Sequence, residues 1–114
     1  MTIPAKLPNA NRAQIDDSKI VNYLLSLCHP IGSGKAHFFF SLGYTIKSLK
    51  ESLLNLAVSG NISYYETNAF GTKYIVDGKV VSPFNREVNI RSVWIVDNND
   101  LQPRLVTAYP LEAI

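Results

Sequence analysis

The stretch RSVWIVDNNDLQPRLVTAYP, residues 91–110, decides the fold, because it is typical of two β-strands joined by a polar turn. In the first strand, Val88, Ile90, Trp94 and Val96 alternate with Asn89 and Arg91, which is the period-2 pattern of a sheet with one buried face. The second strand begins at Arg104 and stops at Pro110, which cannot donate a hydrogen bond to a neighbouring strand. The sequence therefore predicts a β-hairpin in the last third of the chain.

The same alternation extends backward through the chain to about Asn61. Strands are expected over residues 62–67 and 72–81, around a turn that contains Gly71. Residues 82–85 and 97–100 are rich in Ser, Pro, Asn and Asp, which favour turns. We therefore expect four strands in meander order within residues 61–110.

Residues 16–59 show helical patterns instead. Asp16, Asp17 and Ser18 are good capping residues for a first helix that runs to about Leu27. Pro and two glycines break the chain at 29–34, and a second helix over 35–43 is expected to end at Gly43 in a left-handed conformation. Thr45 starts the third helix, whose apolar residues recur at helical spacing up to Ser59-Gly60, namely Ile46, Leu49, Leu53 and Leu56.

These elements predict one α+β domain spanning residues 1–114, because the chain is too short for a second core. An extended arm over residues 1–15 precedes the helices, and an antiparallel four-stranded meander sheet follows them. One face of the sheet should pack on the helices, which leaves the other face free for a ligand.

Composition excludes several classes of protein. The net charge is +2 and there is no run of Lys or Arg, so a polybasic nucleic-acid tail or membrane patch is absent from the sequence. The single cysteine, Cys28, cannot form an internal disulfide, indicates a reducing compartment and is typical of a buried structural thiol. With no signal-peptide pattern and no apolar stretch of transmembrane length, we expect a soluble, cytoplasmic protein that does not bind a membrane.

Known enzyme motifs are mostly missing. GSGKAH at 32–37 lacks the spacing and the Ser or Thr of a Walker phosphate loop. His29, His37 and Cys28 do not form a spaced zinc set, and Asp97 with Asp100 is more typical of a solvated turn than of a cation site. The sequence therefore predicts no metal and no other cofactor.

Four polar residues of the last two strands suggest an anion-binding sheet face: Arg91, Arg104, Thr107 and Tyr109. Few acids accompany them in these segments, so the face suits a phosphodiester. The alternative for Arg104 is a surface ion pair with Asp100. Strand alternation also sets Arg104 on the opposite face from Thr107 and Tyr109, unless a β-bulge intervenes.

The sequence resembles a small bacterial family of uncharacterised domains, found as stand-alone genes and in phage-like and polymorphic toxin proteins. The resemblance is carried by LPNANRAQID, YLLSLCHPIGSGKAHFFFSLGY, GTKYIVDGKVVSP and VNIRSVWIVDNNDLQPRLVTAYP, which cover nearly the whole chain. It implies a place among the barnase/EndoU/colicin/RelE-like ribonuclease toxins, which are metal-independent and have helices followed by a four-stranded antiparallel sheet. Fold membership does not establish activity.

The family's motifs match this chain at the helix-opening Lys35-Ala36, at Gly43, at Gly71 and Tyr74, at Trp94, and at the closing Pro103, Arg104, Thr107 and Tyr109. Many relatives have a His or another polar residue directly before the Lys, where this chain has Gly34. This difference leaves the general base open between Lys35 and His37.

The implied reaction is cleavage of RNA by its own 2′-hydroxyl, which needs a base, a cation for the phosphoryl oxygens and an acid for the leaving oxygen. Lys35 or His37 would be the base, Arg91 and Arg104 would bind the phosphoryl oxygens, and Thr107 and Tyr109 would hold the phosphate and the leaving group. Tyr74 and Trp94 are the candidates for stacking on a base. Each has a structural alternative: Lys35 as an exposed helix residue, His37 and Trp94 as packing residues, and the tyrosines as half-buried sheet residues.

Two functions follow from these residues. The first is a metal-independent endoribonuclease toxin that acts on mRNA, tRNA or rRNA and is held in check by an antitoxin or immunity protein. The second is a non-catalytic interaction module that binds an acidic partner protein through the basic sheet face.

Overall fold

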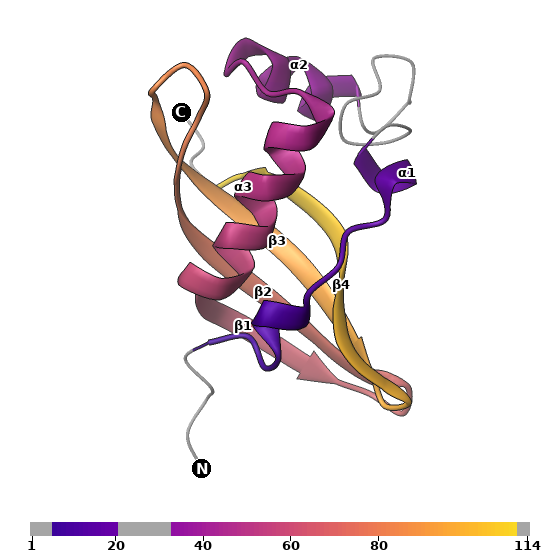
Figure 1. The fold of residues 1–114 in the computed structure, drawn as a ribbon. Coiled ribbons are helices and arrows are strands. Elements are labelled where there is room, and N and C mark those ends of the chain that lie inside the picture. Colours follow the sequence, from indigo (N-terminus) through magenta and orange to yellow (C-terminus); the bar gives the residue numbers. More distant parts are fainter. Residues whose placement is uncertain (1–5, 21–32, 112–114) are drawn as a thin grey trace.

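The computed structural model describes residues 6–20 and 33–111, and it confirms the predicted α+β architecture. Helical elements come first along the chain and strands follow (Figure 1). The elements in chain order are η1 (Ala10–Arg12), α1 (Asp17–Lys19), α2 (Ser33–Ser41), α3 (Ile46–Ser59), β1 (Asn61–Thr67), β2 (Gly71–Val81), β3 (Glu87–Asp97) and β4 (Asp100–Pro110).

The strands form one four-stranded sheet in the order β1-β2-β3-β4, with every neighbouring pair antiparallel. This is the predicted meander, and the observed strands begin or end within a few residues of the expected bounds. Asn98 at the tip of the β3–β4 hairpin donates from its backbone to the Phe70 carbonyl (3.0 Å) and from its side chain to that of Ala69 (2.9 Å). These bonds hold the two hairpin tips of the sheet side by side.

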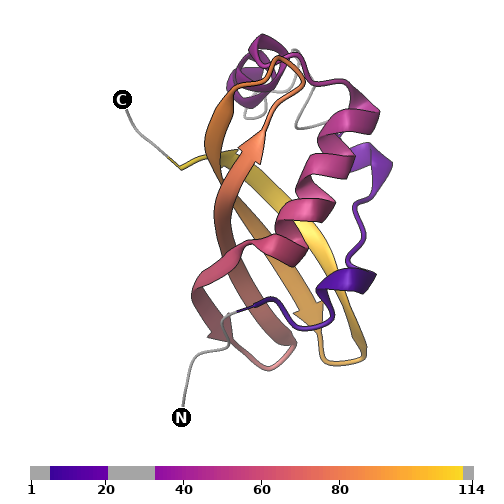
Figure 2. The same ribbon diagram turned by 60° about the vertical axis from the view of Figure 1, so that its left-hand side comes forward.

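Helix α3 crosses one face of the sheet, and none of the helices in the described part of the chain covers the opposite face (Figures 1 and 2). Its first turn is fixed by a capping box, in which Thr45 and Ser48 exchange side-chain to backbone hydrogen bonds. The apolar stripe of α3 packs on the sheet through Leu49, Leu53, Leu56 and Ala57. Ile46, which was expected in this stripe, is 47% exposed, because it lies in the first turn ahead of the buried residues.

Trp94 lies at the centre of the core and is fully buried. Its indole nitrogen donates a 2.8 Å hydrogen bond to the Ser92 hydroxyl, which donates a 2.9 Å hydrogen bond to the Val76 carbonyl. The buried indole N–H of Trp94 therefore has its hydrogen-bond partner within the sheet itself. Ile20, directly after α1, is also fully buried.

The N-terminal region differs from the prediction in two places. The arm predicted to be extended contains the short helix η1 and then pairs with β4, where Gln14 bridges Arg104 in parallel orientation. Ser33 and Gly34, expected in a chain break, begin α2. Among the described residues beyond its chain neighbours and its own helix backbone, none would lie within 4 Å of a Cβ on Gly34, so an alanine would also fit there. The predicted remainder of the first helix, together with Cys28 and His29, lies outside the described residues.

Glycines permit two close approaches that shape the sheet. Gly43 ends the α2 region with a φ of 86°, as predicted, and lies against the Phe84 ring in the β2–β3 hairpin. Gly71 lies so close to β3 that a Cβ there would almost touch the Val96 carbonyl oxygen.

Among the described residues, no helix is long and apolar enough to cross a membrane.

Candidate functional site

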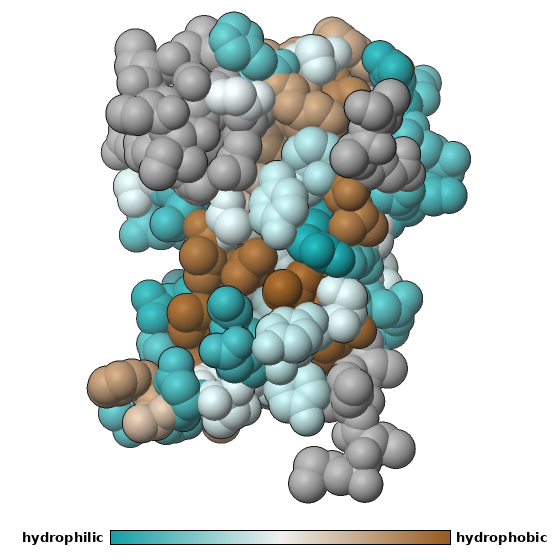
Figure 3. All heavy atoms as spheres, turned by 180° about the vertical axis from the view of Figure 1, so that it is seen from behind, coloured by the Kyte–Doolittle hydropathy of each residue, from teal (hydrophilic) through white to brown (hydrophobic). Residues whose placement is uncertain are grey.

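The sheet face that α3 leaves uncovered carries the predicted polar residues, and we call it the open face. It is formed by the alternate side chains of β2, β3 and β4 that point away from the helix. Figure 3 views this side of the molecule and shows apolar side chains in its middle with polar ones around them. The residues of the open face used below are Ile75, Asp77, Arg91, Val93, Ile95, Asp97, Arg104, Thr107 and Tyr109.

A β-bulge brings Arg104 onto the open face. Thr107 pairs with Val93, but the next pair along β3 is Trp94 with Leu105, so Val106 is the extra residue in β4. The shift turns Leu105 toward the core, where it is 6% exposed, and sets Arg104 opposite Ile95. Arg104 thereby shares a face with Thr107 and Tyr109, which simple alternation would forbid.

Each of the two arginines of the open face forms an ion pair with an aspartate of the neighbouring strand. Arg91 donates from Nε and Nη2 to the two oxygens of Asp77, both at 2.9 Å. Arg104 pairs with Asp97 through Nη2, in place of the alternative partner Asp100. The expectation that few acids accompany these arginines is therefore wrong for the folded face, because the register brings Asp77 and Asp97 beside them.

Tyr109 lies directly across from Arg91 in the β3–β4 register. The hydrogen bond to Asp77 raises the pKa of the Arg91 guanidinium above its ordinary value, and Tyr109 contributes in the same direction. Thr107 follows on the same face, opposite Val93. A guanidinium, a phenol and a hydroxyl thus lie on adjacent positions of two strands.

The two candidate bases belong to helix α2, separate from the strands. Lys35 is the third residue of the helix, and its side chain lies outside the described part of the structure. His37 is in the same helix, and its side chain is exposed. The predicted meeting of Lys35 with Arg91, Arg104, Thr107 and Tyr109 in one cleft stays a prediction.

Tyr74 and Trp94 lie on the sheet face covered by α3, opposite to the arginines. They pair with each other across β2 and β3, and Trp94 is completely buried. Tyr74 is half-buried and stacks on Tyr65, with ring centroids 6.1 Å apart. In this structure the Trp94 ring is a core residue, so it is not accessible for stacking on a base.

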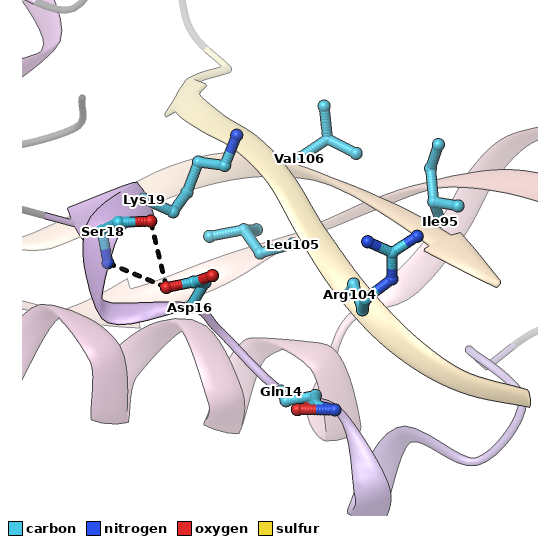
Figure 4. Close-up of a pocket in the computed structure, with 8 residues that line it drawn as sticks. All are labelled: Gln14, Asp16, Ser18, Lys19, Ile95, Arg104, Leu105 and Val106. Carbon is cyan, nitrogen blue, oxygen red and sulfur yellow. Dashed lines mark hydrogen bonds between the residues drawn. The ribbon is translucent and has the colours of Figure 1, made fainter. Parts of the chain in front are cut away.

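A groove with a volume of about 440 Å³ borders the open face at the outer edge of β4 (Figure 4). The N-terminal arm and α1 form one side of it, and residues of β3 and β4 form the other. Arg104 belongs to both the groove and the open face. The lining residues are Gln14, Asp16, Ser18, Lys19, Ile95, Arg104, Leu105 and Val106.

Sequence reasoning missed the groove and the acidic partners of the arginines. Asp77 could have been found by aligning β2 on β3, since both strands were predicted and Asp77 falls opposite Arg91. No local signal marks Gln14, because its contacts lie about ninety residues further along the chain. Within residues 6–20 and 33–111, no three His, Cys, Asp or Glu side chains gather as ligands for a metal ion.

The fold and the open face define a small α+β domain with a polar sheet face beside an edge groove. Residues 6–112 match the family described as "Domain of unknown function (DUF6883)", and the chain therefore belongs to this family. A search of curated proteins finds no match.

A solved structure shares the fold. The chain is similar to one chain of the "Contact-dependent growth inhibition toxin - immunity protein complex from Klebsiella pneumoniae 342", with a TM-score of 0.71 and 17% sequence identity. The alignment covers 92% of this chain and 98% of that chain. The likeness therefore extends over the whole domain.

Proposed function

We propose that this domain is a metal-independent endoribonuclease toxin that cleaves RNA through attack of the 2′-hydroxyl. The observation that carries the proposal is the convergence of Arg91, Arg104, Thr107 and Tyr109 on the open face, which depends on the bulge at Val106. The fold it shares with a chain of a toxin and immunity protein complex supports the toxin role.

The ion pairs of the open face orient the arginines without using all their donors. A guanidinium has five N–H groups, of which Arg91 commits Nε and Nη2 to Asp77 while it also interacts with the Tyr109 hydroxyl. The remaining N–H groups of Arg91 and Arg104 would bind the phosphoryl oxygens, whose negative charge grows in the transition state. Asp77 and Asp97 would hold both planes in place before RNA arrives.

The hydroxyls of the face complete the chemistry. Thr107 would donate to a phosphoryl oxygen, and Tyr109 would position or protonate the departing 5′-oxygen. Lys35 or His37 of α2 would take the proton from the 2′-hydroxyl. The products would carry a 2′,3′-cyclic phosphate, because the attacking oxygen belongs to the same ribose.

An induction experiment tests the proposal. The intact chain is expressed from an inducible promoter, protein synthesis is followed by amino-acid incorporation, and purified protein is incubated with total RNA with and without EDTA. We expect arrest of protein synthesis in the induced cells. With the purified protein we expect RNA fragments ending in cyclic phosphate, formed equally with and without EDTA. Arg104→Ala should abolish both effects, and the matched Arg12→Ala, at an exposed position of η1, should preserve them.

The same experiment separates the alternative function. A non-catalytic module that binds an acidic protein would leave RNA intact in every variant. The half-buried apolar residues Ile75 and Ile95 between the two ion pairs favour this alternative, because a protein partner could bury them. Intact RNA together with a co-purifying partner that is lost in Arg104→Ala would replace the ribonuclease proposal with this one.

A further inference from the structure

The groove beside β4 has a rigid wall on the side of the N-terminal arm. The Gln14 backbone nitrogen donates a 2.9 Å hydrogen bond to the Pro103 carbonyl, and its carbonyl accepts a 3.2 Å bond from the Leu105 nitrogen. The Gln14 side-chain nitrogen donates to the Gln102 side chain at 2.7 Å. This bond commits one of the two N–H groups of the Gln14 amide, and the carbonyl oxygen of the amide remains an acceptor.

Asp16 adds a second acceptor to the same wall. One of its carboxylate oxygens accepts from the backbone and the hydroxyl of Ser18, both at 3.0 Å. These bonds lower the pKa of Asp16 below its ordinary value, so the group is a carboxylate at neutral pH. Figure 4 shows its other oxygen turned from Ser18 toward β4.

The remaining surfaces of the groove suit a flat ring with a phosphate attached. Ile95, Leu105 and Val106 supply apolar surface. Arg104 supplies a cation next to the open face, and Lys19 supplies a second cation on the side of α1 (Figure 4). A volume of about 440 Å³ can hold one nucleotide. Because Arg104 lines the groove and also lies on the open face, a chain bound at the reacting phosphate would pass directly into it.

We infer that this groove holds the base of one RNA nucleotide whose phosphate binds Arg104, and that it selects bases with an exocyclic amino group over uracil. This inference rests on the proposed ribonuclease function. A wall of acceptors from Asp16 and Gln14 can receive hydrogen bonds from the amino groups of cytosine, adenine or guanine. Uracil presents a carbonyl oxygen where cytosine has its amino group, and an N–H where cytosine has its ring acceptor, so a carbonyl oxygen of uracil would face the carboxylate that receives the cytosine amino group.

Binding of two mononucleotides tests the selection without any need for cleavage. Uniformly ¹⁵N-labelled protein is titrated with 3′-CMP and with 3′-UMP, which differ only in the base, and the dissociation constants are taken from amide shifts. We expect 3′-CMP to bind about five to ten times more tightly than 3′-UMP, the discrimination typical of a polar contact with a base edge. The shifts should include the amides of Gln14, Ser18 and Val106.

A pair of charge-matched variants then assigns the selection to the groove. Asp16→Asn keeps a good helix-capping residue but replaces the carboxylate by an amide that also donates, so the preference for 3′-CMP should vanish. Asp17→Asn removes the same charge from the neighbouring residue, which pairs with Lys50 away from the groove, and should retain the preference.

The outcomes separate this inference from the proposed function. Equal affinity for the two nucleotides, or a preference that survives Asp16→Asn, overturns the inference even if RNA is cleaved. A preference lost only in Asp16→Asn supports the groove as a base-binding site. If that result accompanies intact RNA in the induction experiment, the groove stands as a nucleotide site and the ribonuclease proposal fails.

Discussion

Arg91 and Asp77 face each other across β3 and β2 and are joined by two parallel hydrogen bonds of 2.9 Å. The side chains are 31% and 17% exposed, so the pair is partly shielded from water. Fork-shaped pairs of this kind are stronger and more directional than single surface contacts. The open face therefore has a fixed guanidinium at one end, whether or not a ligand is bound.

A double-mutant cycle on this pair should give a measurable coupling. We expect Asp77→Ala and Arg91→Ala each to lower the free energy of unfolding by about 1–2 kcal/mol, with a favourable coupling energy of about 1 kcal/mol. Urea denaturation at pH 7 measures all four proteins of the cycle. The exposed pair Asp17 and Lys50 is the control and should show a coupling below about 0.5 kcal/mol. Equal coupling in both cycles would contradict the special role of the Arg91 pair.

The buried hydrogen bonds from Trp94 to Ser92 and from Ser92 to the Val76 carbonyl give a second prediction. Ser92→Ala removes the acceptor of the buried Trp94 indole N–H and should destabilise the domain by about 1–3 kcal/mol. Ser63→Ala, at an exposed position of β1, should change stability by less than about 0.5 kcal/mol. Urea unfolding followed by the fluorescence of the single tryptophan compares the two variants. A loss at Ser92 as small as that at Ser63 would mean that water satisfies the indole.

Two glycine substitutions should act in opposite directions. Gly71→Ala forces a Cβ against the Val96 carbonyl and should destabilise the sheet by more than about 2 kcal/mol. Gly34→Ala adds a methyl group to a helix where no described residue beyond the chain neighbours and the helix's own backbone lies within 4 Å, and should stabilise the domain by about 0.5–1 kcal/mol. Thermal unfolding measures both effects: the melting temperature should fall in Gly71→Ala and rise in Gly34→Ala. A tolerated alanine at residue 71 would show that β2 and β3 can move apart there.

The lowered pKa of Asp16 predicts a pH dependence. Because the folded state favours the carboxylate, its stabilising contribution is complete above the ordinary pKa of 3.8 and is lost as the pH falls through the lower folded value. A carboxyl NMR titration should place the midpoint of Asp16 below 3.8. In Ser18→Ala, which removes the hydroxyl partner, the midpoint should rise toward 3.8. A midpoint unchanged by this substitution would show that the hydroxyl does not hold the carboxylate.

Local sequence patterns were enough to predict most of the fold. The capping residue Thr45 and the leucine spacing predicted α3, and the alternation around Trp94 predicted the strands and the face that packs on the helix. These features depend on residues within one helix or strand. For the same reason Gly43 was correctly predicted as a left-handed residue.

The candidate site depends on contacts that local patterns do not encode. The bulge at Val106 follows from the packing of Leu105 in the core, and this packing involves residues that are distant in the sequence. The groove exists only because Gln14 pairs with β4 at the other end of the chain. The ion pairs require the register of neighbouring strands, so Arg91 and Arg104 were predicted to share a surface but without their carboxylates.

Because Val106 is an extra residue in β4, the spacing of the two guanidinium groups depends on the number of residues in this part of the strand. Arg91 reaches the open face by regular alternation, whereas Arg104 reaches it only because Val106 occupies a position without a partner. Relatives that lose or gain one residue between the positions of Arg104 and Thr107 would therefore change whether the two guanidinium groups lie on one face of the sheet. Substitutions of Val106 by other residues would leave their spacing unchanged, so insertions and deletions here are the changes through which the arrangement of the two arginines can diverge.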